Sequence, residues 1–431
     1  MFNLKKTNKN LKNRSVGQPN KVFDDEVGAP SRQHKPDYLL VIITLILLLI
    51  GLVTMYSIGP ALAISQGVDQ HYFVNKQLLA IGLGLTAFVI FSYVSLDFLA
   101  RSRKKLIWLS LISILAAVIL SGPPGGADRW VQVGGLSFQV AELIKLSVIV
   151  WVAWFLVQRL KTSEIKSSKK TLYPLLILIG LAGVLVAGLQ SDFGSAGVIV
   201  AITVVMAFSA GLPIKRLALI GAIVLVGATL SIVSTPYRQD RLATFLNPTS
   251  DCQNQGYQTC QALIAVGSGG MFGLGIGNSV QAYGYQPEAA NDSIFAILGE
   301  TFGFVGSTAI IGLFALLFSR MRRIIIHTSD SFSRLLVIGV LVWLGTQTII
   351  NVGAMIGLLP LKGITLPFIS FGGTSMVFVM AAMGVVFKIS KYTSFSPVRN
   401  VLLNKSGGNS RDNSISGRRQ RRPHYATARS R

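Results

Sequence analysis

The residues best placed for chemistry are a few carboxylates next to long apolar runs. Asp292 ends a polar stretch and is followed almost at once by the apolar run 294–319. A carboxylate in that position can cap the N-terminus of the following helix. It can equally serve as a general base at the edge of the apolar phase. The sequence leaves both interpretations of Asp292 open.

A second carboxylate has a basic partner within one helical turn. Glu142 and Lys145 lie three residues apart in an otherwise apolar segment, so a helix would place both on one face. The two charges could neutralise each other and let the segment enter an apolar phase, or they could face a substrate. Glu300, two turns into the run 294–319, is expected to be a buried acid that is hydrogen-bonded to a neighbouring helix.

A glycine-rich run suggests a different kind of site. Gly267-Ser268-Gly269-Gly270 is followed by further glycines at 273, 275 and 277. The run matches neither nucleotide-binding pattern, GxGxxG after a strand or GxxxxGK followed by Ser or Thr. Its backbone N–H groups would still suit a lipid-linked diphosphate.

The elements that carry these residues are predicted to be membrane helices. Only 13% of the 431 residues are charged, about half of what a soluble protein carries, and the mean hydropathy is +0.56. This excludes an ordinary cytosolic enzyme, a disordered chain and a disulfide-stapled secreted domain. Segments near the ~20 residues that cross a bilayer predict an all-α, polytopic protein with ten transmembrane helices. These segments are 38–58, 77–95, 106–121, 141–158, 174–189, 194–210, 214–234, 294–319, 335–356 and 365–387.

The lysines and arginines predict the orientation of these helices. With the N-terminus inside, 34 of the 40 Lys and Arg residues fall in inside segments, five fall outside, and Lys145 lies within a span. Cytoplasmic loops carry such an excess, so both termini are expected in the cytoplasm. The membrane domain 38–389 is expected to lie between two disordered basic tails, 1–37 and 390–431. The C-terminal arginines are expected to contact anionic lipid headgroups rather than nucleic acid.

Three long outside segments predict a working surface that faces outward. The longest, 235–293, lies between the seventh and eighth spans, and 122–140 and 357–375 are rich in Gly and Pro. Long loops in compact proteins tend to be functional. Cys252 and Cys260 both lie in the longest segment, where a disulfide is feasible in an oxidising compartment and two free thiols are the alternative.

Five motifs, in the same order along the chain, resemble those of the SEDS family (shape, elongation, division and sporulation), which includes FtsW and RodA. The segment 127–146 resembles the family's Arg-Trp…Gln-x-x-Glu-x-x-Lys motif, and 190–194 resembles its Gln-Pro-Asp-x-Gly turn. The glycine run 262–277 and the segments 287–295 and 351–375 match three further motifs. Lys362-Gly363 after Leu359-Pro360 looks more like FtsW than RodA.

The resemblance implies a peptidoglycan glycosyltransferase of the bacterial cytoplasmic membrane. Such an enzyme polymerises lipid II, an undecaprenyl-diphosphate-linked disaccharide, at the outer face, together with a class B penicillin-binding protein. Septal synthesis in cell division is expected, with the elongation paralogue as the alternative. Other divisome or elongasome membrane proteins are expected partners, and nucleic acid is not.

The resemblance also implies roles for residues of the matching motifs. The family's catalytic aspartate corresponds to Asp292. The residues expected to bind substrate are Arg129, Glu142, Lys145, Asp192, Ser268, Gly269, Gly270, Glu288, Lys362, Ser370 and Ser375.

The chain departs from the family around the aspartate. Ala290 and Asn291 stand where the family has His-Thr, Ser293 replaces a Phe, and Ser191 replaces the Pro of the earlier turn. The loss of the His removes a second titrating group. A mechanism that needs that imidazole therefore does not carry over, whereas one that needs the aspartate does.

The expected chemistry suits these residue types. A diphosphate is already a good leaving group and needs cations, for which Arg129, Lys145, Lys362, Arg238 or a divalent ion would serve. No metal site built from the protein's own residues is expected. The attacking sugar hydroxyl needs a base, the role given to Asp292. Direct displacement inverts the anomeric carbon, whereas retention would need a second carboxylate, and Glu288 is the nearest.

Two non-enzymatic functions remain as alternatives. A transporter, such as a lipid II flippase, should show repeat halves with polar residues near mid-span. The polar features here concentrate at outer helix ends and outer loops, which favours the enzyme. A scaffold for the penicillin-binding partner would still support that partner after Asp292 is replaced by Asn.

Overall fold

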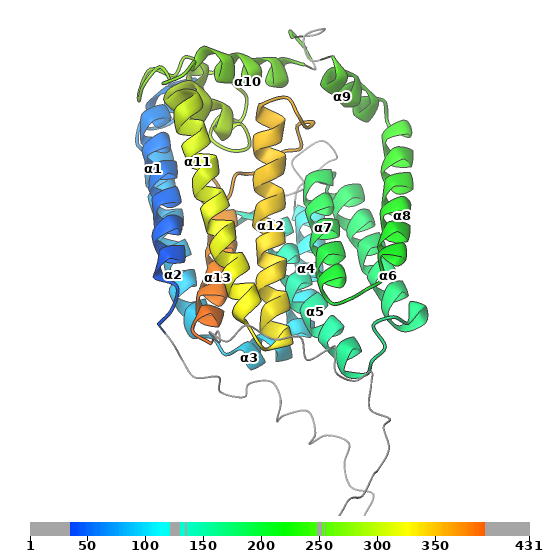
Figure 1. Cartoon of the computed structure of the whole chain (residues 1–431). Helices are drawn as coiled ribbons and strands as arrows, with labels where there is room; N and C mark the ends of the chain where they lie inside the picture. Colours follow the sequence, from blue (N-terminus) through cyan, green and yellow to red (C-terminus); the bar gives the residue numbers. More distant parts are fainter. Residues whose placement is uncertain (1–34, 121–129, 134–135, 248–251, 255, 393–431) are drawn as a thin grey trace, which may run out of the picture.

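The computed structural model describes residues 35–120, 130–133, 136–247, 252–254 and 256–392, which form a bundle of helices with short helices across one end (Figure 1). The predicted tails lie almost entirely outside the described residues. The α-helices are α1 (Tyr38–Gln66), α2 (Tyr72–Tyr93), α3 (Leu96–Arg101), α4 (Arg103–Leu120), α5 (Val140–Lys161), α6 (Tyr173–Ala182), α7 (Phe193–Ser209), α8 (Ile214–Val233), α9 (Pro236–Leu246), α10 (Tyr257–Ser268), α11 (Ile294–His327), α12 (Ser331–Met355) and α13 (Gly373–Ser390). Two π-helical segments, Ser168–Leu172 and Gly183–Leu189, flank α6, and a 3-10 turn covers Gln281–Tyr283.

Eight helical segments of the described chain are long and apolar enough to cross a bilayer, which confirms a polytopic helical membrane protein. The predicted spans 106–121 and 194–210 fall in α4 and α7. α7 has 17 residues, and α4 opens with three consecutive basic residues. Their crossing of the bilayer, and so the count of ten, stays a prediction.

The last predicted span begins later than hydropathy suggested. Residues from 365 were expected to be helical, but α13 begins at Gly373. Pro367 and Phe368 explain the difference, since Phe368 has a left-handed φ of 67° and its side chain is buried. The apolar residues 364–368 therefore form packed irregular chain rather than helix.

A small β-hairpin is the one departure from the all-α prediction within the described residues. β1 (Trp130–Val133) pairs antiparallel with β2 (Leu136–Gln139), with Trp130 opposite Gln139. The hairpin leads directly into α5. Its end is tied to α13 because the Gln139 N–H donates to Thr374 Oγ1 at 2.9 Å.

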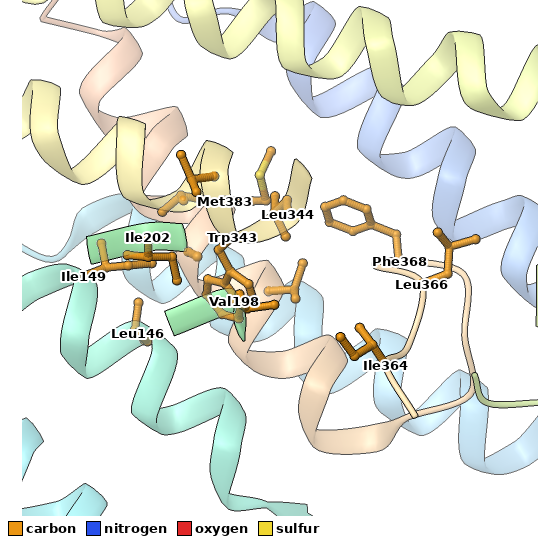
Figure 2. Close-up of a cluster of buried hydrophobic side chains, with 14 of the residues drawn as sticks. Leu146, Ile149, Val198, Ile202, Trp343, Leu344, Ile364, Leu366, Phe368 and Met383 are labelled. Atoms are coloured by element: carbon orange, nitrogen blue, oxygen red, sulfur yellow. The ribbon is translucent and has the colours of Figure 1, made fainter. Parts of the chain in front are cut away.

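The centre of the bundle is formed by α5 and α12. Both are apolar almost all round and buried, as expected for core helices. Figure 2 shows Ile149 of α5, Ile202 of α7 and Met383 of α13 gathered near Trp343 of α12, while Phe368 of the irregular segment points toward Leu344 of α12. By contrast, α8 stands at the edge of the bundle, and Ile220 is its one buried residue (Figure 1). Its remaining apolar side chains suit contact with lipid.

The glycine run serves backbone packing. α11 contains a non-helical residue, Gly303, with φ 65° and ψ −166°. Around this kink the carbonyls of Glu300 and Thr301 accept hydrogen bonds from Leu274 and Gly275 at 2.9 and 3.1 Å. The N–H groups of Phe304 and Val305 in turn donate to the carbonyls of Gly270 and Met271, at 2.9 and 3.1 Å. The run thus satisfies the backbone groups that the kink frees.

Gly269 packs so closely that any side chain would collide. A Cβ at this position would lie 2.0 Å from the Gly299 carbonyl oxygen. The run was expected to bind a diphosphate, and for Ser268, Gly269 and Gly270 that role stays a prediction. The structure accounts for Gly269 and Gly273 by close approach of chain to chain, and for Gly270, Gly275 and Gly277 by their positive φ.

Cys252 and Cys260 form a disulfide, with S–S 2.07 Å and Cα–Cα 5.6 Å. This confirms the disulfide over the alternative of two free thiols. The bond joins the chain before α10 to the first turn of that helix, and it suits an oxidising compartment.

Gly269→Ala is expected to destabilise the protein by about 2 kcal/mol or more, because the added methyl forces α10 and α11 apart. Gly267→Ala is the matched control, since a Cβ there meets nothing within 4 Å. Thermal unfolding of both variants in the same detergent measures the difference. Equal melting temperatures would contradict the packing role of Gly269.

Candidate functional site

Asp292 lies just before α11, at the end of the bundle crossed by α9 and α10 (Figure 1). The N-cap position of α11 is occupied by Ser293, and its side chain makes no capping hydrogen bond. Asp292 is one residue outside that position. This weighs against helix capping as the reason for a carboxylate here.

The chain around Asp292 is held through its main-chain carbonyls. Asn351 Nδ2 donates to the Asp292 carbonyl and to the Ile364 carbonyl, both at 2.7 Å. An amide nitrogen carries two hydrogens, so these two bonds use its full donor capacity. Asn351 of α12 therefore joins the segment that contains Asp292 to the segment that contains Ile364.

Ser370 makes a second clamp on the same segment. Its Oγ donates to the Asn291 carbonyl at 2.7 Å and accepts from the Leu366 N–H at 2.7 Å. The Phe371 N–H donates to the Ala290 carbonyl at 2.8 Å. Residues 290–292 are thus fixed through backbone carbonyls, and the side chain of Asp292 takes no part in these anchors.

Asp292 and Lys362 line one small pocket between α12 and the segment 361–364. Its other walls are apolar side chains and Asn351. The pocket encloses about 10 Å³, which is room for roughly one water. A carboxylate and an ammonium group are therefore brought together in largely apolar surroundings. A sugar substrate would require this pocket to widen.

Two cations also meet around Phe193 at the start of α7. The Lys362 Nζ lies 5.9 Å from the ring centroid, and the Arg238 Cζ lies 4.4 Å from it. Arg238 is further held by Ser231, whose carbonyl and Oγ accept at 2.9 and 2.6 Å. Two cations are thus available to an anion here, while the buried Asp192 carboxylate at the N-cap of α7 offsets the partial positive charge of that helix end.

Asp192 is the N-cap of α7. Its Oδ1 accepts from the Ser195 N–H at 2.9 Å, and the residue is buried. Its Oδ2 is also buried and has no hydrogen-bond partner among the described residues. Asp192 therefore positions the helix end at which Arg238 and Lys362 gather, while direct contact with substrate stays a prediction.

Glu142 and Lys145 form an ion pair inside the bundle. Their Oε1 and Nζ lie 2.7 Å apart, and each side chain is 1% exposed. Gln347 Nε2 donates to Glu142 Oε1 at 3.3 Å, and Lys145 Nζ lies 5.9 Å from the Trp343 ring centroid. The pair faces other helices in this structure, which favours neutralisation over a substrate-facing role.

α12 connects this pair to the Asp292 pocket. Trp343, Gln347 and Asn351 follow one another at intervals of four residues, so they lie on one helix face. Trp343 covers Lys145, Gln347 contacts Glu142, and Asn351 holds Asp292. The contacts to Glu142 and Asp292 are about 6 Å apart along the helix axis.

The remaining predicted site residues take structural positions or lie outside the described residues. Glu288 is exposed, with a left-handed φ of 53°, and accepts from Asn291 Nδ2 at 2.5 Å. Ser375 is buried and lies 3.4 Å from Thr365 Oγ1. Ser268 bonds to its own helix at Ala265. Arg129 lies outside the described residues.

Glu300 is buried and hydrogen-bonded as expected, but its partners lie at residues 279–281 rather than on a neighbouring membrane helix. Its carboxylate accepts from Ser279 Oγ and from the N–H groups of Val280 and Gln281, at 3.0 and 3.3 Å for Oε1. It thereby caps the 3-10 turn Gln281–Tyr283.

Asn351 and Gln347 are the important residues that the sequence analysis missed. A buried amide in a predicted membrane helix is itself a signal, because polar groups there need a partner. No group of three or more His, Cys, Asp or Glu side chains placed to hold a metal occurs in the described part of the chain.

Together these features define a polytopic helical membrane protein with a carboxylate and a cation in a pocket at one end of its bundle. The family model of the FtsW, RodA and SpoVE cell cycle proteins matches residues 37–395. The chain belongs to this family.

Relatives support the same assignment. Stage V sporulation protein E of Bacillus subtilis (strain 168) is 37% identical over 369 residues, covering 85% of this chain and 100% of the relative. A probable peptidoglycan glycosyltransferase FtsW of Coxiella burnetii is 39% identical over 364 residues, covering 83% of this chain and 96% of the relative.

Solved structures share the fold. A chain from a peptidoglycan synthase complex, described as coordinating polymerization and crosslinking, is 26% identical with a TM-score of 0.68, over 82% of this chain and 97% of that one. The rod shape determining protein RodA of Thermus thermophilus is 26% identical with a TM-score of 0.60, over 83% of this chain and 98% of that one.

The buried pair predicts a specific pattern of stability. Glu142→Gln and Lys145→Met are each expected to destabilise the protein by about 3–5 kcal/mol, because each leaves a buried charge alone. The double variant should recover most of that loss, since neither charge remains. Thermal unfolding of the four proteins in one detergent measures the coupling.

Arg159→Met is the control, because Arg159 pairs with Glu164 at 3.0 Å where both side chains are about one-quarter exposed. We expect it to change stability by about 1 kcal/mol or less. Additive losses in the Glu142 and Lys145 double variant would contradict a neutralising pair.

Proposed function

We propose that this protein is a peptidoglycan glycosyltransferase that polymerises lipid II into glycan strands at the outer face of the bacterial cytoplasmic membrane. The observation that carries the proposal is the pocket shared by Asp292 and Lys362 at the end of the bundle. The named function of the FtsW relatives supports it. The pairing of Glu142 with Lys145 weakens the transporter alternative, because the described interior presents these charges to each other.

Asp292 acts as the general base in this proposal. Its carboxylate removes the proton from the acceptor sugar 4-hydroxyl as that oxygen attacks C1 of the donor. The bond from C1 to the diphosphate oxygen breaks, and the lipid diphosphate leaves with the electron pair. A single displacement of this kind inverts the anomeric carbon.

Lys362 and Arg238 stabilise the departing diphosphate. Both lie around Phe193 at the start of α7, so they can act together on the negative charge that develops. Arg129, Lys145, Lys362 and Arg238 were all expected as candidates for this role, and Arg129 lies outside the described residues. Lys145 is buried against Glu142, so we assign the diphosphate to Lys362 and Arg238. A divalent ion carried by the diphosphate itself would add to their effect.

The orientation and partners follow from the same proposal. The end with Asp292, α9, α10 and the disulfide faces outward, and both termini lie in the cytoplasm. A class B penicillin-binding protein crosslinks the strands, as suggested by the likeness to a chain of a synthase complex. The septal process is supported by the FtsW-like names of the relatives, and contacts with other divisome proteins belong to the same proposal.

Asp292→Asn is expected to lower polymerisation of lipid II by about 10²–10⁴-fold, because the amide cannot accept the hydroxyl proton. Its melting temperature should stay near that of the wild type, since Asn351 binds the main-chain carbonyl of residue 292. The measurement is glycan product from purified protein, with and without the penicillin-binding partner and with and without chelator.

Glu288→Gln is the matched control, an exposed carboxylate four residues earlier. If the enzyme is inverting, Glu288→Gln should keep its polymerisation activity. If the enzyme is retaining and uses Glu288 as nucleophile, the same variant should lose that activity. Full polymerisation by Asp292→Asn would refute the proposed base. Movement of labelled lipid II across vesicles without any glycan product would favour a flippase instead.

Asn351→Ala is expected to lower kcat by roughly 100-fold, because loss of its two hydrogen bonds releases the segment that positions Asp292. Thr348→Ala is the control, since it removes a buried hydroxyl of the same helix that bonds only to the Leu344 carbonyl. Polymerisation assays on folded protein compare the two. Equal kcat values would show that Asn351 does not position the base.

A further inference from the structure

A cavity of about 320 Å³ lies at the opposite end of the bundle from Asp292. There the start of α1 meets the last turns of α11 and the end of α13 (Figure 1). We call it the basic cavity and define it by Lys35, Asp37, Arg320, Arg323 and His327. None of these residues belongs to the site described above.

The one carboxylate in the basic cavity is already engaged. Asp37 Oδ2 lies 2.8 Å from Arg320 Nη2 and accepts from Arg320 Nε at 3.0 Å. Its Oδ1 accepts from the Leu40 N–H at the start of α1, at 3.4 Å. Among the described residues, Lys35 and Arg323 have no carboxylate partner. The cavity therefore keeps a net positive charge that its own residues do not neutralise.

His327 adds a polar group to the same wall. Its Nδ1 lies 2.7 Å from the Arg323 carbonyl oxygen. A carbonyl can only accept, so Nδ1 carries the hydrogen and Nε2 is left for another partner. The cavity thus combines one further ring nitrogen with two cations that have no carboxylate partner in the described part of the chain.

The position of the basic cavity along the membrane normal corresponds to the layer of lipid headgroups. α11 has 34 residues and runs from the Asp292 end to Arg323 and His327. At 1.5 Å per residue it spans roughly 50 Å, against about 40–45 Å for a bilayer with its headgroups. When Asp292 lies at one membrane surface, the basic cavity lies at the other.

An apolar stripe on α1 continues from the cavity. Leu39 lines the cavity, and Ile42, Ile46 and Leu49 follow it on the same helix face. All four side chains are exposed, Leu49 by 58%. A cationic cavity joined to exposed apolar surface matches a molecule with a phosphate head and acyl chains.

We propose that the basic cavity binds a phosphate group that is presented by an anionic membrane lipid. Lys35 and Arg323 supply the charge, Arg320 is oriented for it by Asp37, and the exposed face of α1 receives an acyl chain. Such a lipid would hold together the ends of α1, α11 and α13. The proposal is independent of the glycosyltransferase function.

The test uses the full-length protein in neutral detergent and measures bound lipid by native mass spectrometry. Phosphatidylglycerol, phosphatidylcholine and inorganic phosphate are added separately to wild type, Arg323→Gln and the double variant Lys35→Gln/Arg323→Gln. Arg322→Gln is the matched control, because Arg322 is the exposed neighbour of Arg323 and does not line the cavity. Melting temperatures without lipid confirm that each variant folds.

We expect Arg323→Gln to weaken phosphatidylglycerol binding about fivefold and the double variant about 25-fold. Arg322→Gln should bind as wild type does. Phosphate binding that follows the same variant pattern would support the site and assign it a soluble source. Equal binding by Arg323→Gln and Arg322→Gln, or phosphatidylcholine bound as tightly as phosphatidylglycerol, would overturn the proposal.

Discussion

Irregular backbone within a membrane protein has little water to bond with, so its carbonyl and N–H groups must find partners in the protein. This constraint is met at the Asp292 end of the bundle by a few side chains, of which Asn351 is central. Its one amide nitrogen joins the Asp292 carbonyl and the Ile364 carbonyl. Without it, the buried Ile364 carbonyl would lose its Asn351 partner at a cost of about 1–3 kcal/mol, and the part-buried Asp292 carbonyl would lose its bond to Asn351 as well.

The same constraint explains why the carboxylate of Asp292 is suited to chemistry. Its segment is anchored through main-chain atoms by Asn351 and Ser370, so the side chain can face the pocket with Lys362. The backbone groups that the kink at Gly303 frees also find partners in the protein, because the glycine run bonds to them. Structural hydrogen bonding and chemistry are therefore carried by different atoms of the same segment.

Sequence predicted the parts of the fold that the bilayer itself dictates. Long apolar runs located the helices, and the polar stretches between them located Asp292 and the two cysteines, whose bonding the sequence left open. The partners of Asn351 could not be predicted, because Asp292 lies 59 residues away along the chain. The packing of Gly269 against α11 could not be predicted either. A glycine-rich run has the same sequence pattern whether its N–H groups bind a ligand or its Cα atoms pack against a second helix. The approach of Arg238 and Lys362 to the Phe193 ring depends on three segments that are distant in sequence.

The most direct measurement is a structure of the protein with acceptor glycan and lipid-linked donor bound. The pocket beside Asp292 should then be widened, with the acceptor hydroxyl about 2.6–3.2 Å from the Asp292 carboxylate and the diphosphate against Lys362 and Arg238. An acceptor hydroxyl bound instead at Glu288, or a donor held at the opposite end of the bundle, would contradict Asp292 as the base.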